Sequence, residues 1–203
     1  MKPWNGWYHA NGNTYGTWLP GDPRGWRVKG HRQHVEGDYK NPPAPGTGEG
    51  LQEYSRKAMR KGEVFLDKHQ RPIVGRALVE MLVRQDVELL VLSMGAAHYH
   101  LLGRFVDGVV RPRVGRAKKH ATFTLMEHGG EGALWAAGCR VLPITDRSHQ
   151  VNVFNYIRNH ASAGAWIWTF REGIYWNQTR PTPPSPKLPD GVREILPNDP
   201  CNY

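Results

Sequence analysis

Cysteine is scarce in this sequence, and no apolar run is long. Cys139 and Cys201 are the only two cysteines among 203 residues, too few for a disulfide framework or a cysteine-based zinc site, which favours a reducing compartment. The first eight residues contain no apolar segment of the kind found in signal peptides. The longest apolar-rich run, residues 89–97, is about half as long as a membrane-spanning helix. We therefore expect a cytoplasmic protein with no membrane partner.

Nucleotide-binding loops and an acidic balance are also missing. No Gly-x-x-x-x-Gly-Lys-Ser/Thr loop occurs, and Gly46, Gly48 and Gly50 lie in a proline-rich stretch, so we expect no nucleotide cofactor. Lys and Arg number 27 against 18 Asp and Glu, giving a formal net charge of +9. Such an excess attracts polyanions, of which nucleic acid is the commonest. Charge alone fits a basic protein without a nucleic-acid site equally well.

The organisation of the chain predicts one catalytic domain over residues 1–176 and a proline-rich, extended C-terminal tail over residues 177–203. A domain of this size buries roughly 70% of the surface that its unfolded chain exposes. Residues of about 27–70 are rich in glycine, proline and charge and are interpreted as a long loop, with a short helix at 51–61.

The hydrophobic patterns outside this loop predict an α+β fold, in which helices cover one sheet. Pro72 is typical of a helix start, Gly95 separates two strands of a hairpin, and Asp146 or Thr145 can cap the last helix. The predicted strands are 13–19, 87–94, 98–105 and 132–143, and the predicted helices are 72–85, 113–126 and 147–162.

Two histidines flank a tyrosine in the predicted strand 98–105. Side chains alternate along a strand, so His98 and His100 point to one face and Tyr99 to the other. Imidazoles about 7 Å apart along the backbone can converge on one divalent metal. The alternative is two half-exposed histidines on a sheet face.

A tyrosine and a third histidine share one side of the predicted helix 147–162. Tyr156 and His160 are four residues apart and project one turn from each other, whereas Val153 and Ile157 can pack inward. If this helix lies beside the histidine strand, a phenol and a third imidazole join the pair. The alternative is an ordinary helix tyrosine with its ring in the core.

These two segments resemble a known family. Residues 92–102 resemble the metal-binding strand of HUH endonucleases, in which two histidines flank a hydrophobic residue. Residues 156–160 resemble the catalytic helix of the single-tyrosine branch, which includes transposases of small insertion sequences and REP-associated tyrosine transposases. The order of elements is similar too, and the resemblance covers about residues 8–26 and 70–170.

The sequence departs from the family at two places. Relatives often have Pro-Asp or Pro-Asn before the first histidine, where this chain has Ala96-Ala97. The fourth position after the tyrosine is commonly Asn or Gln in relatives, where this chain has His160, with Asn159 one step earlier. The third metal ligand is therefore less closely matched to the family than the first two.

The resemblance implies a ferredoxin-like antiparallel sheet. It also implies a transposase, which is a metal-dependent endonuclease and strand-transferase that acts on hairpin-bearing single-stranded DNA. A homodimer is compatible with this family. Tyr156 is then the nucleophile that forms a 5′-phosphotyrosine, His98, His100 and His160 hold the metal, and Asn159 is a possible auxiliary residue. The family implies Mg²⁺ or Mn²⁺. Histidine ligation by itself suggests zinc or another transition ion, and three nitrogens suit Mn²⁺ better than Mg²⁺.

Basic residues after the histidine strand are candidates for contact with the DNA backbone, although a solvated helix face fits them equally well. The candidates are Arg104, Arg111, Arg113, Arg116, Lys118 and Lys119. Residues 165–171 place three aromatics on one side, where they could stack on unpaired bases, but core packing is the commoner role. Trp7, Trp18 and Trp26 have the same two interpretations.

Two other functions fit the sequence. One is a non-catalytic module, derived from such an enzyme, that binds a structured single-stranded nucleic acid and no longer needs the histidines. The other is a histidine-zinc hydrolase that uses metal-bound hydroxide and does not need Tyr156.

Overall fold

The computed structural model describes residues 2–23, 26–27, 34–35 and 44–171. The tail predicted over 177–203 and parts of the loop predicted over 27–70 lie outside the described residues. A five-stranded sheet with the order β6-β1-β5-β4-β7 organises the rest, and every neighbouring pair is antiparallel. Its strands are β1 (Trp7–Asn13), β4 (Glu88–Met94), β5 (His98–Arg104), β6 (Arg140–Pro143) and β7 (Trp166–Thr169).

The helices follow the strands in the order that the sequence predicts. They are α1 (Glu49–Lys57), α2 (Gln70–Arg84), α3 (Val110–Glu127) and α4 (Arg147–Asn159), with short 3-10 helices η1 (Trp4–Gly6) and η2 (His160–Ala163) and a small ribbon of β2 (Trp26–Arg27) and β3 (His34–Val35). The succession β1, α2, β4, β5, α3, β6 is that of a ferredoxin-like fold, to which β7 adds an edge strand. The predicted α+β class is therefore confirmed.

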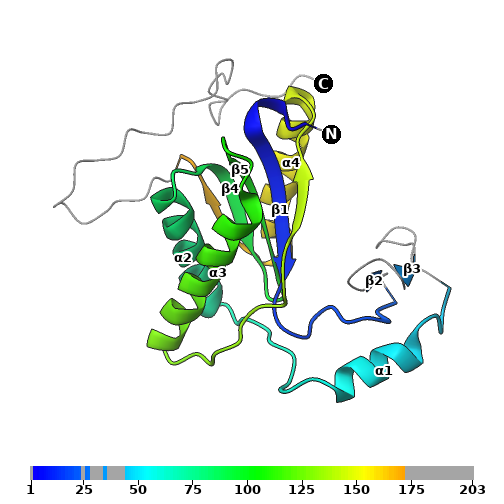
Figure 1. Ribbon diagram of the computed structural model, residues 1–203. Coiled ribbons are helices and arrows are strands. Elements are labelled where there is room, and N and C mark those ends of the chain that lie inside the picture. The colour runs from blue at the N-terminus through cyan, green and yellow to red at the C-terminus, as the bar shows by residue number, and fades with distance from the viewer. Residues whose placement is uncertain (1, 24–25, 28–33, 36–43, 172–203) are drawn as a thin grey trace.

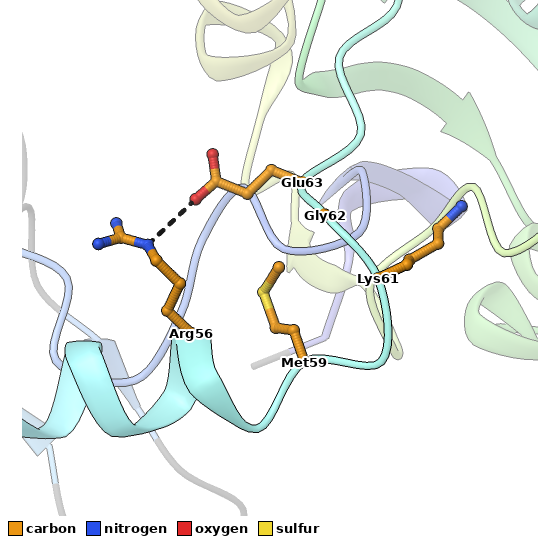
Figure 2. A pocket seen from close by; sticks show the side chains of 5 residues that line it. All are labelled: Arg56, Met59, Lys61, Gly62 and Glu63. Carbon is orange, nitrogen blue, oxygen red and sulfur yellow. Dashed lines mark ion pairs between the residues drawn. The ribbon is translucent and has the colours of Figure 1, made fainter.

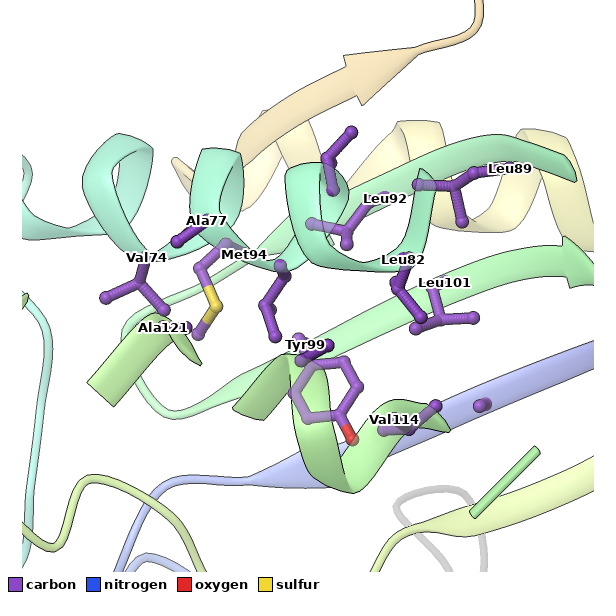
Figure 3. Close-up of a cluster of buried hydrophobic side chains, with 14 of the residues drawn as sticks. Val74, Ala77, Leu82, Leu89, Leu92, Met94, Tyr99, Leu101, Val114 and Ala121 are labelled. Carbon is purple, nitrogen blue, oxygen red and sulfur yellow. The ribbon is translucent and has the colours of Figure 1, made fainter. Parts of the chain in front are cut away.

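Helices cover both faces of the sheet (Figure 1). α2 and α3 pack together over one face, where Tyr99 and Leu101 join the larger core, part of which Figure 3 shows. α4 packs over the other face through Val153 and Ile157, which meet Leu102 in a second, smaller core. Alternation along β5 therefore sends His98 and His100 toward α4 and buries Tyr99 beneath α2 and α3, as the sequence predicts.

The first strand lies earlier than the sequence analysis predicts. The strand predicted at 13–19 is wrong, because β1 ends at Asn13 and the chain then turns. Asn11 and Gly12 are poor strand formers, but β1 lies between β5 and β6 and pairs with both of them. Gly12 is required there, since a Cβ atom at this position would lie 2.9 Å from the ring of Tyr99.

The strand predicted at 132–143 is also mostly wrong, since only its last four residues form β6. The preceding segment makes one isolated bridge, between Trp135 and Thr14. The Lys118 ammonium group donates to the carbonyl oxygens of Ala136 and Gly138, each at 2.7 Å. Those carbonyls are therefore occupied by a side chain, and the segment follows α3 as an irregular loop.

The boundaries of α2, α3 and α4 lie within three residues of the predicted ones, whereas α1 begins two residues before and ends four residues before the helix predicted at 51–61. Pro72 lies in the first turn of α2, where a missing backbone N–H is tolerated. The Asp146 side chain accepts a hydrogen bond from the His149 backbone N–H at 2.8 Å and caps α4, as one of the two predicted caps. α4 ends at Asn159, and the last turn of the predicted helix is η2. Among the described helices, none is long and apolar enough to cross a membrane.

Candidate active site

Three histidines from two elements meet on the α4 face of the sheet. His98 and His100 come from β5, and His160 begins η2 directly after α4. Ring centroids lie 5.2 Å apart for His98 and His100, 5.6 Å for His98 and His160, and 4.6 Å for His100 and His160. One nitrogen from each ring lies within 4.8 Å of the others, so the three can share one ion.

Tyr156 lies beside this cluster and is 44% exposed, whereas Val153 and Ile157 on the adjoining side of α4 pack into the core. Its ring centroid lies 4.8 Å from that of His160 and 5.4 Å from that of His100. The interpretation of Tyr156 as a core tyrosine is therefore wrong. The phenol can be reached by a large substrate while it remains next to the imidazoles.

The hydrogen bond of His160 fixes which of its nitrogens is available. Its Nδ1 lies 3.0 Å from the backbone carbonyl oxygen of Tyr156. A carbonyl oxygen only accepts, so Nδ1 carries the proton, and in the neutral ring Nε2 keeps its lone pair. His160 is thus suited to bind a metal through Nε2.

His100 is held in its neutral form. Burial, helped by the neighbouring His9, lowers the pKa of His100 from 6.5 to about 2. The ring therefore stays uncharged at neutral pH and can act as a ligand.

His9, which the sequence motifs do not include, contacts His100 directly. His9 lies on β1, is 7% exposed, and its Nε2 lies 2.9 Å from Nδ1 of His100. Burial and the positive charge of Arg140 lower the pKa of His9 to about 4. The signal that could have found it is alternation along Trp7–Asn13, which places His9 and Asn11 on the face that His100 shares.

Asn159 is exposed at the last position of α4, one residue before His160. Its backbone carbonyl accepts a hydrogen bond from the Ser162 hydroxyl at 2.7 Å. Asn159 is three residues after Tyr156, a spacing that makes the two neighbours on the helix surface, but it points about 100° away from His160. Its auxiliary role stays a prediction.

The donor set fits a divalent transition ion. Imidazole nitrogens bind such ions at about 2.1 Å, which holds neighbouring donors roughly 3–3.5 Å apart. The observed atoms, all within 4.8 Å of one another, would have to move closer together to reach that separation. Three nitrogens leave further positions open for water or substrate and suit manganese or zinc better than magnesium.

The predicted DNA contacts lie mostly on the other layer of the molecule. α3, which carries five of the six, packs with α2 on the face of the sheet opposite α4 (Figure 1). Arg113 pairs with Asp107 at 2.6 Å, and Arg116 donates to the Gln85 side chain at 2.5 Å. Contact with DNA stays a prediction for these residues. Their position on the face opposite the histidines was not expected from the sequence.

The remaining candidates differ in how their charges are used. Arg104 is at the end of β5 and pairs with Glu88 at 3.0 Å. Lys118 is only 8% exposed and its ammonium group is directed into the fold, whereas Arg111 and Lys119 are exposed. Exposed Arg111 and Lys119 can reach a phosphate without breaking any contact described above.

The aromatic residues of the last strand pack into the core. Trp168 is buried, and Trp166 and Phe170 pack against the larger cluster, which confirms core packing over base stacking. Trp7 is likewise buried, while Trp18 is exposed. Trp18 therefore stays a candidate for stacking.

A surface pocket lies apart from the two motifs, at the end of α1 and in the segment that follows it (Figure 2). Arg56 and Glu63 form an ion pair of 3.7 Å across it. Its lining residues are Arg56, Met59, Lys61, Gly62 and Glu63, which include no imidazole or phenol. This segment is tied to the hairpin that carries His98, since the Leu66 N–H donates to the Ala96 carbonyl at 2.8 Å.

Comparisons with known proteins give one structural likeness. No family model and no curated protein matches the chain. A solved structure described as a REP-associated tyrosine transposase bound to a REP hairpin is similar, with 13% sequence identity and a TM-score of 0.47. The alignment covers 81% of this chain and 70% of that one. At this level of similarity, the case for function rests on the residues themselves.

Proposed function

We propose that this protein is a metal-dependent endonuclease and strand-transferase acting on single-stranded DNA, with Tyr156 as the nucleophile. One observation carries the proposal. The exposed Tyr156 ring lies 4.8 Å from the ring of His160 and 5.4 Å from that of His100, centroid to centroid, and both histidines belong to the cluster of three candidate metal ligands. A phosphodiester bound over this cluster would have an electrophilic centre and a nucleophile on the same surface. The resemblance of the two motifs to HUH endonucleases supports this choice.

His98, His100 and His160 would hold the metal. When bound, a divalent cation supplies Lewis-acid stabilisation of the charge that grows on the phosphate oxygens during displacement. The three imidazoles contribute no negative charge, so the full charge of the cation is available to the phosphate. This makes the all-histidine set suitable for a polyanionic substrate.

Tyr156 would attack phosphorus, forming a Tyr156 Oη–P bond and breaking the bond from phosphorus to the 3′ oxygen. The phenol proton ends on that oxygen, so the products are a 5′-phosphotyrosine and a free 3′ hydroxyl. One phosphodiester replaces another, and an incoming 3′ hydroxyl can reverse the step without ATP. Forming phenolate at pH 7 from a group of pKa near 10 costs about 4 kcal/mol, which a nearby positive charge reduces.

The substrate would be single-stranded DNA next to a hairpin. Unpaired DNA backbone can contact the exposed surface around Tyr156, and the chain's net charge of +9 favours binding of a polyanion. The cation would be Mn²⁺ or Mg²⁺, of which Mn²⁺ better suits three nitrogen ligands.

The test is formation of a covalent protein–DNA adduct. The protein is incubated with Mn²⁺ and a pool of hairpin-bearing single-stranded oligonucleotides with randomised flanks and a label at the 3′ end, because the tyrosine keeps the 3′ fragment. A labelled band that survives denaturation is expected, and chelator or Tyr156→Phe should abolish it. Tyr54→Phe is the matched control, since Tyr54 is exposed on α1. No adduct from the unaltered protein, or an undiminished one from Tyr156→Phe, contradicts the proposal.

A histidine-zinc hydrolase is the second candidate, because three histidines with open coordination positions are also typical of catalytic zinc. This function predicts stoichiometric zinc in the purified protein and phosphodiester turnover that survives Tyr156→Phe. The same variant therefore separates the two functions.

A further inference from the structure

His9 makes a contact that neither motif explains. Its Nε2 lies 2.9 Å from Nδ1 of His100, and the two rings are stacked with centroids 5.2 Å apart. The residue comes from β1, 91 positions earlier in the chain than His100. A buried imidazole pair of this kind needs one donor and one acceptor, so exactly one proton lies between the two nitrogens when both rings are neutral.

The direction of that hydrogen bond decides whether His100 can be a ligand. If His9 donates, neutral His100 carries its proton on Nε2 and has no lone pair left for a cation. If His100 donates through Nδ1, its Nε2 lone pair is free to join His98 and His160. Nδ1 itself is occupied by His9, so Nε2 is the nitrogen through which His100 can bind.

The surroundings hold His9 in place. On one side it pairs with Leu102 of β5 and on the other with Leu142 of β6, so its backbone is fixed by two strands. The Tyr156 ring covers it edge-on, with centroids 6.1 Å apart. A ring confined in this way can orient its neighbour at little further cost in conformational entropy.

We propose that His9 is a positioning residue: its Nε2 accepts the Nδ1–H of His100 and thereby holds Nε2 of His100 unprotonated toward His98 and His160. The inference rests on the proposed metal site. It assigns His9 no contact with the substrate, and its effect passes entirely through His100. Residues that orient metal-binding histidines in this way typically change metal affinity 10- to 100-fold when they are replaced.

Two substitutions separate hydrogen bonding from packing. His9→Gln keeps an acceptor oxygen near the position of Nε2, whereas His9→Leu fills the space without an acceptor. Mn²⁺ affinity is measured for the full chain by electron paramagnetic resonance of the free ion, and thermal unfolding is followed in parallel. His128→Leu is the matched control, because His128 is exposed at the end of α3.

His9→Leu should weaken Mn²⁺ binding by about 10- to 100-fold. His9→Gln should restore most of that affinity, and His128→Leu should leave it unchanged. Equal losses in both His9 variants at equal thermal stability, or unchanged affinity in His9→Leu, would overturn the assignment.

A second readout needs no metal. The ¹⁵N chemical shifts of the His100 ring in the metal-free protein should report a proton on Nδ1, and His9→Leu should move the ring toward a mixture of tautomers. A proton on Nε2 in the unaltered protein would overturn the proposal. If the unaltered protein binds neither Mn²⁺ nor Zn²⁺, the proposed function fails, while the ring shifts still decide the role of His9.

Discussion

His160 donates a hydrogen bond through Nδ1 to the backbone carbonyl of Tyr156, 3.0 Å away and one helical turn earlier. The same turn that aims the phenol and the imidazole at one point therefore also orients the imidazole. The proposed third ligand and the proposed nucleophile are thus coupled through the backbone of α4.

This coupling predicts that His160, and not Asn159, is the third metal ligand. His160→Ala should weaken Mn²⁺ binding by more than about tenfold, because a ligand matters at least as much as a residue that orients one. Asn159→Ala should leave the affinity nearly unchanged, since Asn159 is exposed and lies about 100° around the helix from His160. Calorimetric titration checks both variants. A loss of Mn²⁺ affinity in Asn159→Ala alone would identify Asn159 as the ligand and contradict this prediction.

The proposed nucleophile and the three proposed ligands lie together within one chain, which predicts catalysis without exchange of the tyrosine helix between copies. The Tyr156 ring and the His100 ring of the same molecule are 5.4 Å apart. A mixture of Tyr156→Phe and His98→Ala proteins should therefore form no more adduct than either variant alone. Recovery of adduct in the mixture would instead mean that the tyrosine serves a partner's histidines. The cleavage assay of the proposed function measures this directly.

Acid should destabilise the metal-free protein through His9 and His100. Their pKa values are about 4 and about 2 in the fold, against 6.5 in the unfolded chain. Well above pH 6.5 both rings are neutral in either state and contribute no pH dependence. Below it the unfolded chain binds more protons, so the free energy of unfolding falls by up to about 1.4 kcal/mol per pH unit for each histidine.

Urea unfolding between pH 7 and pH 4.5 measures that slope. His9→Gln and His100→Gln should each give a shallower dependence on pH, because each variant removes one titrating group. Slopes equal to that of the unaltered protein would show that other groups govern the acid response.

Substitutions of the neighbouring Lys118 and Lys119 should have different effects, the first on stability and the second on DNA binding. Lys118→Met leaves the carbonyls of Ala136 and Gly138 without their charged donor, so the free energy of unfolding should fall by roughly 1.5–3 kcal/mol. Lys119→Met should change it by less than about 0.5 kcal/mol, since Lys119 is exposed. Chemical unfolding measures both, and equal effects would contradict the structural role of Lys118. If Lys119 contacts DNA, its substitution should also reduce the salt dependence of binding.

The sequence was sufficient for the parts of the site that depend on local periodicity. His98 and His100 share a face because a strand repeats every two residues, and Tyr156 and His160 share one because a helix repeats every 3.6. Each pair could be recognised without knowing what lies beside it.

His9 was missed because its role depends on pairing between distant strands. The polar residues Asn11 and Gly12 weaken the strand pattern of β1, which is stabilised by β5 and β6 on its two sides. The shortening of β6 has a similar origin, since the buried ammonium of Lys118 occupies carbonyls that the local sequence could have used for pairing. Tertiary contacts of this kind leave little trace in local patterns.

The account stands on Tyr156 as the nucleophile that becomes covalently joined to the 5′ phosphate of the cleaved DNA. Trypsin cleaves after Arg147 and Arg158, so Tyr156 is the only tyrosine in the peptide of residues 148–158. Mass spectrometry of the nuclease-trimmed adduct should find the added nucleotide 5′ phosphate on this peptide, at Tyr156. A nucleotide attached to any other residue would contradict the account.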